Sequence, residues 1–449
     1  MEPLQRHVFV CTQEKPEGVP SCSACGSTQM LAALYGELGT QGMTEQVQVT
    51  TCGCLGFCDH SPVMIVYPEG TWYHNVLAAD IPELVASHLR RGQSVSRLAW
   101  SDHDALQKEV LEHNEHYRAM LRTRDELGIL PDYLNDMIRG FMTSRVILTA
   151  LELDMFTVVG SGASAAEVAG RITTDLRATE VLLNALVSLK VLEKKDGMFV
   201  NTRDSSRFFV DGSKDSARKA LLHTANLWQR WSSLSEAVHS GGPVSNGGRS
   251  PEKVDSFIAA MDRNAKERLQ PLLKAVDATR VRRLLDLGGG SGAYAIAFAK
   301  AVPELRADVM DLPEVIPLTQ HYIRRANVGG RVVARAGNML RDPLGKNYDL
   351  AVLSAICHMF SPGENCLLFR RVREALAPGG QLLIQDFILE PDKTAPRFAA
   401  LFALNMLVGT RGGSTYSEAE YATWLREAGF SDVCRMKVPG PGGLILARV

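Results

Sequence analysis

An apolar strand that ends in a cluster of glycines is the feature that most constrains this fold. Residues 284–287 (Leu-Leu-Asp-Leu) have the composition of a buried strand, residues 288–292 read Gly-Gly-Gly-Ser-Gly, and a helix is expected over residues 294–300. Glycines let the backbone approach a ligand closely, and a helix N-terminus offers free N–H donors. The segment therefore predicts a strand–turn–helix unit that holds a ligand.

Strand-like and helical segments alternate through the C-terminal part of the chain. This alternation predicts a doubly wound parallel sheet with helices on both faces. The expected strands are residues 284–287, 307–310, 332–334, 350–353, 382–385 and 444–447. With 449 residues, the chain is long enough for two or three domains, and its overall class is a multidomain α/β protein.

Charge and hydropathy exclude several classes of protein. The net charge is −1, which gives no global attraction to nucleic acid. The sequence contains no run of about 18 apolar residues, which is the length that a transmembrane helix needs. We therefore expect no membrane partner. The N-terminus shows no basic segment followed by an apolar one, which is the pattern of a secretory signal. A cytoplasmic protein is the expectation.

Polar residues near the glycine turn indicate which ligand it holds. Asp286 precedes the glycines, Asp311 ends the next expected strand, and Asn338 and Met339 follow the third. Asp311 is placed to bind ribose hydroxyls, and Asn338 and Met339 to hold an adenine. These features favour S-adenosylmethionine. Gly288, Gly290 and Ala293 also satisfy the dinucleotide fingerprint G-x-G-x-x-A, so a nicotinamide enzyme is the alternative.

Several stretches together resemble the small-molecule O-methyltransferases related to the caffeic-acid and acetylserotonin enzymes. They are residues 285–292, 311–313 (Asp-Leu-Pro), 356–358 (Ile-Cys-His), Gly412-Gly413 and 418–421 (Glu-Ala-Glu-Tyr). The resemblance implies a Rossmann-like methyltransferase domain over residues 227–449. It also implies an S-adenosylmethionine site made by Asp286, Gly288, Gly290, Gly292, Asp311, Leu312, Asn338, Met339 and Ser354.

Residues 131–226 show a winged-helix pattern. Three expected helices precede a hairpin at residues 191–200, whose Asp196-Gly197 pair is a strong turn signal. A wing can bind DNA, but residues 177–190, the third helix, are mostly apolar, whereas a recognition helix needs basic or amide side chains. The methyltransferase resemblance implies instead a dimerisation domain, and hence a homodimer in which each N-terminal region helps close the partner's active site.

His358 is the candidate general base, because it follows an expected strand on the ligand-binding edge of the sheet. Methyl transfer to a hydroxyl releases a proton, and an imidazole is suited to accept it. The resemblance assigns one supporting carboxylate to Asp386 and places Thr415 where the family has a second; Met359 replaces the usual acidic neighbour of the histidine. A packing role for His358 is the alternative. Some relatives keep the cofactor but catalyse hydroxylation or decarboxylation. The alternative function is therefore a redox enzyme that retains the cofactor, or an electron-transfer protein that performs no methyl transfer.

Apolar residues at helical spacing are candidates for the walls of an acceptor pocket, although ordinary core packing explains each equally well. They suggest an apolar, aromatic acceptor. The residues are Trp228, Phe257, Met261, Phe402 and Met406.

Six of the nine cysteines fall in the first 58 residues, which indicates metal, cluster or redox chemistry in a cytoplasmic chain. Residues 1–98, with the expected order β-α-β-β-β-α, resemble the thioredoxin-like [2Fe–2S] ferredoxins. The matching segments are residues 7–11, 16–18, 25–26, 53–58, 62–70 and 72–73. The resemblance implies four cluster ligands, Cys11, Cys25, Cys54 and Cys58, and a redox partner for the electrons.

The cysteine assignment has alternatives. The loop before Cys25 is one residue longer than usual, so Cys22 is a possible replacement, and Cys52 is an additional cysteine. Cys22 and Cys25 form a C-x-x-C pair before a helix, which would also suit a redox dithiol or, together with Cys54 and Cys58, a zinc site. Residues 99–130 are charged and helix-periodic, and we expect a solvent-exposed connector helix there.

Overall fold

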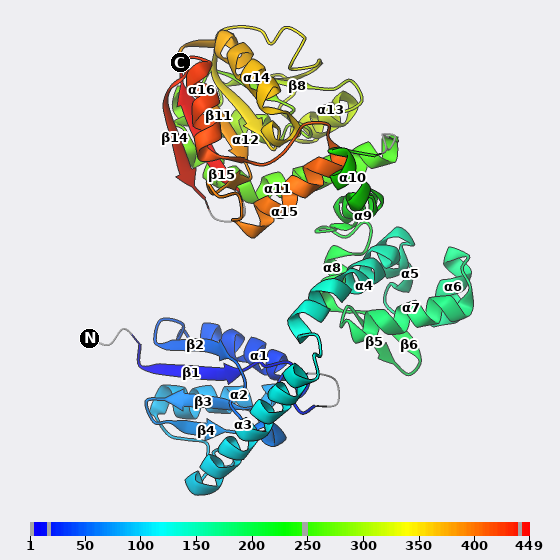
Figure 1. The fold of residues 1–449 in the computed structure, drawn as a ribbon, viewed down its shortest axis with the longest axis vertical. Coiled ribbons are helices and arrows are strands. Elements are labelled where there is room, and N and C mark those ends of the chain that lie inside the picture. Colours follow the sequence, from blue (N-terminus) through cyan, green and yellow to red (C-terminus); the bar gives the residue numbers. More distant parts are fainter. Residues whose placement is uncertain (1–3, 16–18, 245–249, 439–441) are drawn as a thin grey trace. The chain divides into compact units, whose positions relative to one another are not determined.

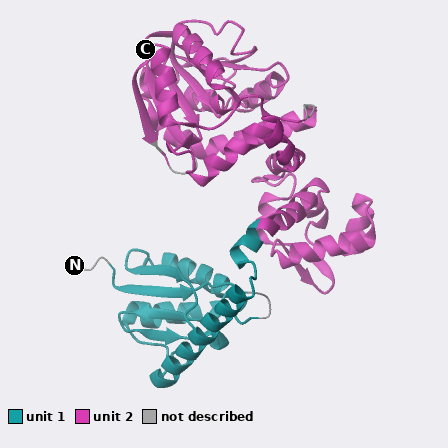
Figure 2. Ribbon diagram, in the orientation of Figure 1, with its two compact units in different colours: residues 1–137 teal, residues 138–449 magenta. Residues whose placement is uncertain are grey.

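The computed structural model describes residues 4–15, 19–244, 250–438 and 442–449, which form two compact units, residues 1–137 and 138–449 (Figures 1 and 2). Residues 16–18, part of the ferredoxin resemblance, lie outside this description. None of the described helices combines the length and the apolar character that crossing a membrane requires.

The first unit is built on a four-stranded sheet in the order β2-β1-β3-β4 (Figure 1). β1 pairs in parallel with β2 and antiparallel with β3, and the expected β-α-β-β-β-α order is confirmed. Its elements are β1 (Arg6–Cys11), α1 (Ser27–Thr40), β2 (Val47–Cys52), β3 (Met64–Tyr67), β4 (Thr71–Tyr73) and a helical segment made of η2 (Ala78–Asp80), α2 (Ile81–Leu84) and η3 (Val85–Leu89).

Helix α3 (His103–Glu126) ends this unit and differs from the expected solvent-exposed connector. Asp102 caps its first turn by accepting a hydrogen bond from the Ala105 N–H (2.9 Å). Leu106 and Val110 pack against a small apolar cluster that contains Cys11, Cys22 and Phe57. The rest of the helix is largely exposed. One face of its first half is therefore part of the first unit's packing, which the charged sequence did not indicate.

The second unit begins with a helical domain that carries the expected wing. Leu148, Phe156, Leu183 and Phe199 are among the buried residues that form its core. The wing turns at Asp196 and Gly197, which both have positive φ (50° and 78°), as the hairpin signal predicts. The elements are α4 (Asp132–Glu152), α5 (Met155–Val159), α6 (Ala165–Ile172), α7 (Leu176–Ser188), β5 (Leu192–Lys195), β6 (Met198–Asn201) and α8 (Arg203–Phe208).

The rest of the second unit surrounds a seven-stranded sheet in the order β14-β15-β11-β10-β7-β8-β9. The five strands from β11 to β9 in this order are parallel, as expected. Their bounds are β7 (Arg283–Leu287), β8 (Arg306–Asp311), β9 (Val332–Ala336), β10 (Tyr348–Ser354), β11 (Leu376–Asp386), β14 (Ser431–Lys437) and β15 (Gly443–Arg448).

The expectation of a wholly parallel sheet is wrong at one edge. β15 pairs antiparallel with β11, and β14 pairs antiparallel with β15. Only residues 438–442 separate these two strands, and a parallel pair needs a crossover of about a dozen residues or more. The short connection therefore dictates a hairpin.

Alternating side chains of the central strands contact helices on opposite faces. Leu284 and Val352 pack with α11 (Pro251–Ala275), α12 (Ala293–Ala301) and α13 (Ile316–Arg325). Leu285 and Leu353 pack with α14 (Pro362–Ala375) and α16 (Glu418–Glu427). Strands buried on both faces leave only their ends for polar groups. The remaining elements are α9 (Arg218–Ser232), α10 (Leu234–Ser240), β12 (Ile388–Leu389), α15 (Arg397–Gly409) and β13 (Tyr416–Ser417).

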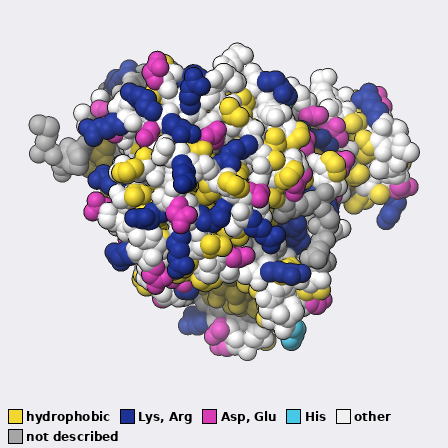
Figure 3. Space-filling view, turned by 90° about the horizontal axis from the view of Figure 1, so that it is seen from above, with side chains coloured by type: hydrophobic (Ala, Val, Ile, Leu, Met, Phe, Trp, Pro, Cys, Tyr) yellow, Lys and Arg dark blue, Asp and Glu magenta, His cyan; other side chains and the backbone are white. Residues whose placement is uncertain are grey.

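The surface carries charges of both signs. On the face drawn in Figure 3, basic, acidic and scattered hydrophobic side chains are interspersed. In α7, the third helix of the wing domain, Thr179, Leu183 and Leu186 are buried, so this helix packs into its domain.

Candidate functional site

Polar side chains gather where the parallel strands of the second unit end. Asp286 lies near the end of β7, Asp311 ends β8, Ser354 ends β10 and Asp386 ends β11. Because these strands are parallel neighbours, their carboxyl ends share one edge of the sheet, where ligands of such folds bind.

The glycine turn has the backbone conformation that its sequence predicts. Gly288, Gly290 and Gly292 have φ of 64°, 56° and 73°, a region that favours glycine. Asp311 closes the turn, because its carboxylate accepts hydrogen bonds from the N–H groups of Gly290 (2.8 Å) and Leu312 (2.7 Å). The turn and the end of β8 therefore form one hydrogen-bonded structure.

Asp286 is buried directly beneath this turn. Its carboxylate accepts a hydrogen bond from the Ala295 N–H at 3.3 Å. Burial raises the pKa of Asp286 to about 7, with a smaller contribution from the charge of Asp311. A Cβ atom on Gly289 would lie only 2.9 Å from the Asp286 carboxyl carbon, so the tight turn depends on glycine there.

Two of the expected adenine-binding residues differ in their surroundings. The Met339 side chain lies beside the glycine turn, with its Cε atom 3.2 Å from the position of a Cβ on Gly288. The Asn338 side chain instead accepts a hydrogen bond from the Leu340 N–H within its own turn (2.9 Å). The structure thus brings Met339 to the turn and engages Asn338 locally.

A polar network that the sequence did not indicate extends from Ser354. Its hydroxyl donates to Gln385 Oε1 (2.8 Å), which also accepts from the guanidinium of Arg268 on α11 (3.0 Å). Gln385 Nε2 is buried and has no partner among the described residues. No motif marks Arg268, because more than a hundred residues separate it from Gln385.

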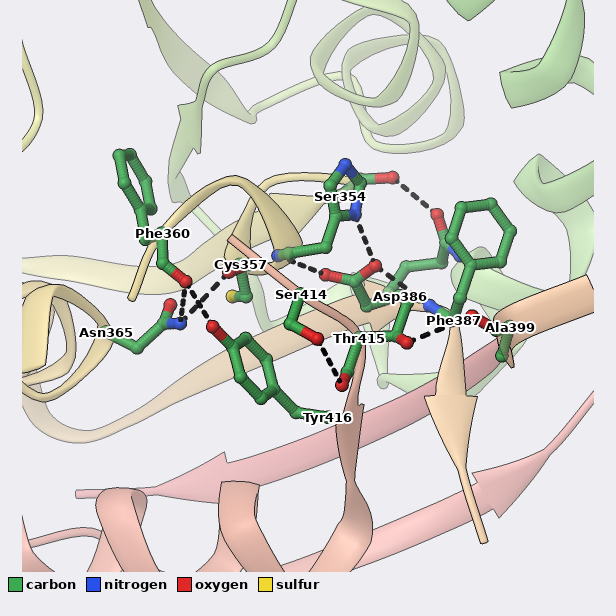
Figure 4. Close-up of polar contacts among 12 residues, drawn as sticks. Ser354, Cys357, Phe360, Asn365, Asp386, Phe387, Ala399, Ser414, Thr415 and Tyr416 are labelled. Atoms are coloured by element: carbon green, nitrogen blue, oxygen red, sulfur yellow. Dashed lines mark hydrogen bonds and ion pairs between the residues drawn. The ribbon is translucent and has the colours of Figure 1, made fainter. Parts of the chain in front are cut away.

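His358 and Asp386 form a buried pair. His358 Nδ1 lies 2.6 Å from Asp386 Oδ1, and both residues are almost fully buried. Asp386 also accepts hydrogen bonds from the backbone N–H groups of His358 (3.1 Å) and Phe387 (2.8 Å) (Figure 4). The Tyr421 hydroxyl donates to the same carboxyl group (3.2 Å). A carboxylate can only accept hydrogen bonds, so in the contact with Asp386 the imidazole is the donor and Nδ1 carries its proton.

Tyr421 makes a hydrogen bond to Asp386, whereas Thr415 makes its hydrogen bond elsewhere. Burial raises the pKa of Tyr421 well above its ordinary value, so its hydroxyl stays protonated and donates to Asp386. Thr415, which stands where the family has a second carboxylate, donates instead to the Ala399 carbonyl (3.0 Å) (Figure 4). Asp386 is therefore the carboxylate that orients His358 in this chain.

Aromatic rings surround His358. The Phe402 ring meets the imidazole edge-on at a centroid distance of 4.9 Å, and Phe387 stacks beside it at 6.0 Å. Phe398 contacts both phenylalanines, and Met406 lies buried further along α15. Phe387 and Phe398 were missed in the sequence, although Phe387 directly follows Asp386.

The other proposed pocket residues make contacts of their own, and their role in the pocket stays a prediction. Trp228 packs against the core of the helical domain, with the Arg145 guanidinium 5.5 Å from its ring centroid. Phe257 is 37% exposed and contacts His223, and Met261 is partly buried on α11. The contacts of Trp228 fit packing between helices. The sequence could not show this, because core residues and pocket residues have the same helical spacing.

In the first unit, two pairs of thiols lie at the ends of β1 and in the loop after β2. Cys54 Sγ and Cys58 Sγ are 3.2 Å apart, and Cys11 and Cys22 are buried in one apolar cluster. The Ser61 hydroxyl lies 3.2 Å from Cys22 Sγ and donates to the Cys58 carbonyl (2.7 Å), so the two pairs are neighbours. The structure therefore groups Cys11, Cys22, Cys54 and Cys58.

This set differs from the one that the ferredoxin resemblance implies. Cys25 is exposed, whereas Cys22 is buried in the apolar cluster around Cys11. The turn between them explains the difference: the Cys25 N–H bonds to the Ser21 carbonyl (3.1 Å) and the Ser27 N–H to the Cys22 carbonyl (2.9 Å). Cys52 is half-buried, and burial raises its pKa to about 11.

Two residues near these thiols were also missed in the sequence. His113 Nε2 on α3 lies 3.7 Å from both Cys54 Sγ and Cys58 Sγ, and the Lys15 ammonium lies 3.1 Å from Cys58 Sγ. Cys54, Cys58 and His113 are close enough to bind one metal ion. The hydrogen bond from Cys58 lowers the pKa of Cys54 to about 5, so thiolate is readily available.

Sequence profiles of two known domains match the second unit. The O-methyltransferase domain matches residues 228–431, and the O-methyltransferase dimerisation domain matches residues 135–211. The first match contains the glycine turn, His358 and Asp386, and the second contains the wing.

Characterised proteins are similar over the same region. The 3-hydroxy-5-methyl-1-naphthoate 3-O-methyltransferase of Streptomyces sahachiroi is 33% identical over 324 residues, which is 70% of this chain and 93% of that protein. Acetylserotonin O-methyltransferase of Bos taurus is 32% identical over 345 residues, 72% of this chain and 97% of that protein.

Solved structures share the fold. Human N-acetylserotonin methyltransferase in complex with SAM superimposes with a TM-score of 0.63 at 28% identity, over 71% of this chain and 96% of that one. PigF with SAH has a TM-score of 0.67 at 27% identity, over 72% of this chain and 100% of that one.

Proposed function

This chain belongs to the O-methyltransferase family, and on that premise we propose that it transfers the methyl group of S-adenosylmethionine to a hydroxyl of a small aromatic acceptor. The observation that carries the proposal is the adjacency of His358 and the glycine turn. A Cβ on Gly288 would lie 2.2 Å from the Cδ1 atom of Ile356, two residues before His358. A base and a cofactor site thus share one edge of the sheet.

The residues at the glycine turn fit S-adenosylmethionine. Asp311, at the end of β8, is placed to accept hydrogen bonds from ribose hydroxyls, and Met339 supplies an apolar contact beside the turn. Asp286, Leu312, Asn338 and Ser354 would complete the site, with the glycines leaving room for the ligand. Relatives with this fold have been solved with SAM and SAH. Bound S-adenosylmethionine would supply a methyl group on a positively charged sulfur.

His358 would accept the proton of the acceptor hydroxyl. Its Nδ1–H donates to Asp386, which fixes the ring and leaves Nε2 as the basic atom. Asp386 stabilises the imidazolium that forms and is itself held by three further donors. Asp386 is thus a positioning residue, and the proton moves only from the acceptor oxygen to Nε2.

The acceptor is proposed to be flat and aromatic. Phe387 and Phe402 lie beside the imidazole, Phe398 contacts both of them, and aromatic rings pack well against one another. Relatives are named for a naphthoate and for acetylserotonin, which are both aromatic. The dimerisation domain supports a homodimer in solution.

Product analysis tests the methyltransferase proposal. Incubation of the protein with S-adenosylmethionine and a panel of hydroxylated naphthoates and indoles should give methyl ethers together with S-adenosylhomocysteine, detected by mass. A hydroxylated or decarboxylated product without S-adenosylhomocysteine would contradict the proposal and favour a redox enzyme.

The first unit is proposed to hold a [2Fe–2S] cluster, which would carry electrons or sense redox state through a separate partner. Four thiols, Cys11, Cys22, Cys54 and Cys58, lie near one another in two pairs, and such a cluster takes two thiolates on each iron. The mixed sheet with its β-α-β-β-β-α order supports a thioredoxin-like domain. We propose Cys22 as the ligand in place of Cys25, because Cys25 faces solvent.

A visible spectrum and metal analysis test the cluster. Anaerobically reconstituted protein should show charge-transfer bands and about two iron and two sulfide per chain. A colourless protein that contains zinc would contradict the proposal, and Cys54, Cys58 and His113 would then be the first ligands to test.

A further inference from the structure

We propose that Lys15 sets the reduction potential of the first unit's [2Fe–2S] cluster, and that helix α3 holds the lysine in place through His113. This inference rests on the proposed cluster and goes beyond its ligands. It assigns a role to two residues outside the cysteine motif, one of which belongs to helix α3 of the first unit.

The Lys15 ammonium lies where three electron-pair donors converge. Its Nζ atom is 3.1 Å from Cys58 Sγ and 3.0 Å from His113 Nε2, and Cys54 Sγ lies 3.2 Å from Cys58 Sγ. An ammonium has three N–H groups, so it can donate to both atoms at once. Lys15 is therefore directed at the Cys54–Cys58 pair.

Helix α3 fixes this arrangement from the opposite side. His113 accepts from Lys15 through Nε2, and the Tyr117 ring one turn later lies 5.5 Å from the same ammonium. The helix also approaches the Cys54–Cys58 loop closely: a Cβ on Gly56 would lie 3.1 Å from Val110 Cγ1 and 3.3 Å from its carbonyl oxygen. Gly56 has φ of 80°, so glycine is favoured there by conformation as well as by space.

Electrostatics gives the expected direction. Reduction adds one negative charge to a cluster that four thiolates already make anionic. A fixed positive charge and hydrogen bonds to the coordinating sulfurs stabilise the reduced form more than the oxidised form. Lys15 should therefore raise the reduction potential, and His113 should do so indirectly by positioning Lys15.

The experiment is a redox titration of the reconstituted full-length protein, followed by its visible spectrum. Lys15→Met should shift the midpoint potential to a more negative value than that of the unmodified protein. His113→Leu should shift it in the same direction by a smaller amount, and His113→Gln, whose amide oxygen can accept from Lys15, should restore much of the loss. Lys108→Met is the matched control, since Lys108 is an exposed lysine on α3 that contacts Glu112.

The outcomes separate this proposal from the one on which it rests. If the unmodified protein takes up no iron and sulfide, both proposals are wrong. If it forms the cluster but Lys15→Met and Lys108→Met have the same potential, the cluster stands and the role of Lys15 is overturned. Strong nitrogen hyperfine coupling from a directly bound imidazole would also overturn it, because His113 would then be a ligand.

Discussion

The His358 site and the cysteine site are assembled in opposite ways. Asp286, Asp311, Ser354 and Asp386 all lie at or near the ends of neighbouring parallel strands, so the sheet places them together. The cysteine site draws on the end of β1, two loops and one face of α3. A rigid sheet thus positions the first site, and loop and helix packing position the second.

This difference has consequences for substitutions. At the sheet edge each side chain has several partners inside the same framework, as Asp386 does with four donors. At the cysteine site, the choice between Cys22 and Cys25 depends on one short turn. Substitutions at the His358 site should therefore disturb only their immediate surroundings. At the cysteine site, replacing one cysteine should decide whether the cluster forms.

The largest expected effect is the loss of the cluster. Cys22→Ser should strip most of the iron or change the visible spectrum, because a coordinating thiolate is removed. Cys25→Ser is the matched control and should keep about two iron per chain, since Cys25 is exposed. The measurement is iron and sulfide content after reconstitution. If Cys25→Ser loses the iron and Cys22→Ser keeps it, the turn rearranges and the ferredoxin resemblance gave the right ligand.

Next in size is the loss of the base. His358→Ala should lower kcat by roughly 10²–10⁴-fold while changing the affinity for S-adenosylmethionine little, because the proposed role of His358 is to accept the proton of the acceptor hydroxyl. Steady-state kinetics and calorimetry measure the two quantities. His321→Ala, which replaces an exposed histidine on α13, should leave both unchanged. An unchanged kcat for His358→Ala, with methyl transfer rate-limiting, would indicate a structural histidine.

Asp286 should make stability depend on pH. Its pKa is raised from 3.8 to about 7 in the folded protein, so the folded state binds more protons than the unfolded state between these values. The contribution of Asp286 to the free energy of unfolding is therefore fully present below about pH 4 and is lost as the pH rises toward 7. Asp286→Asn should gain up to about 4 kcal/mol over the wild type across this range.

Denaturant unfolding of the ligand-free protein from pH 4 to pH 8 measures this difference. Asp432→Asn is the control, because Asp432 is exposed and its substitution should not change the pH dependence. If the free energy of unfolding changes with pH in the same way for Asp286→Asn and the wild type, the raised pKa is contradicted.

The smallest expected effect concerns binding of the methyl donor. Asp311→Ala should weaken S-adenosylmethionine binding by about 1.5–3 kcal/mol, because hydrogen bonds from ribose hydroxyls to a charged acceptor are lost. Calorimetric titration gives the change in Kd. An unchanged Kd, or tight binding of NAD in place of S-adenosylmethionine, would contradict the assignment of this strand end.

The sequence alone determined the parts of the fold that depend on local patterns. The apolar strand before residues 288–292, the Asp196-Gly197 turn and the alternation of strands and helices each follow from short-range stereochemistry, and the structure confirms them. The Ile-Cys-His stretch identified His358 as the candidate base, and the structure pairs it with Asp386. These features are encoded within a few residues of where they appear.

Tertiary structure alone decided the features that depend on contacts between distant segments. The burial of Cys22, the approach of His113 to Cys54 and Cys58, and the contact of Arg268 with Gln385 join residues far apart in the chain. Helical spacing made Trp228 a candidate for a pocket wall, and the structure shows that it packs against the core of the helical domain. Periodicity shows which face of a helix is apolar, but only the packing of the folded chain selects what that face contacts.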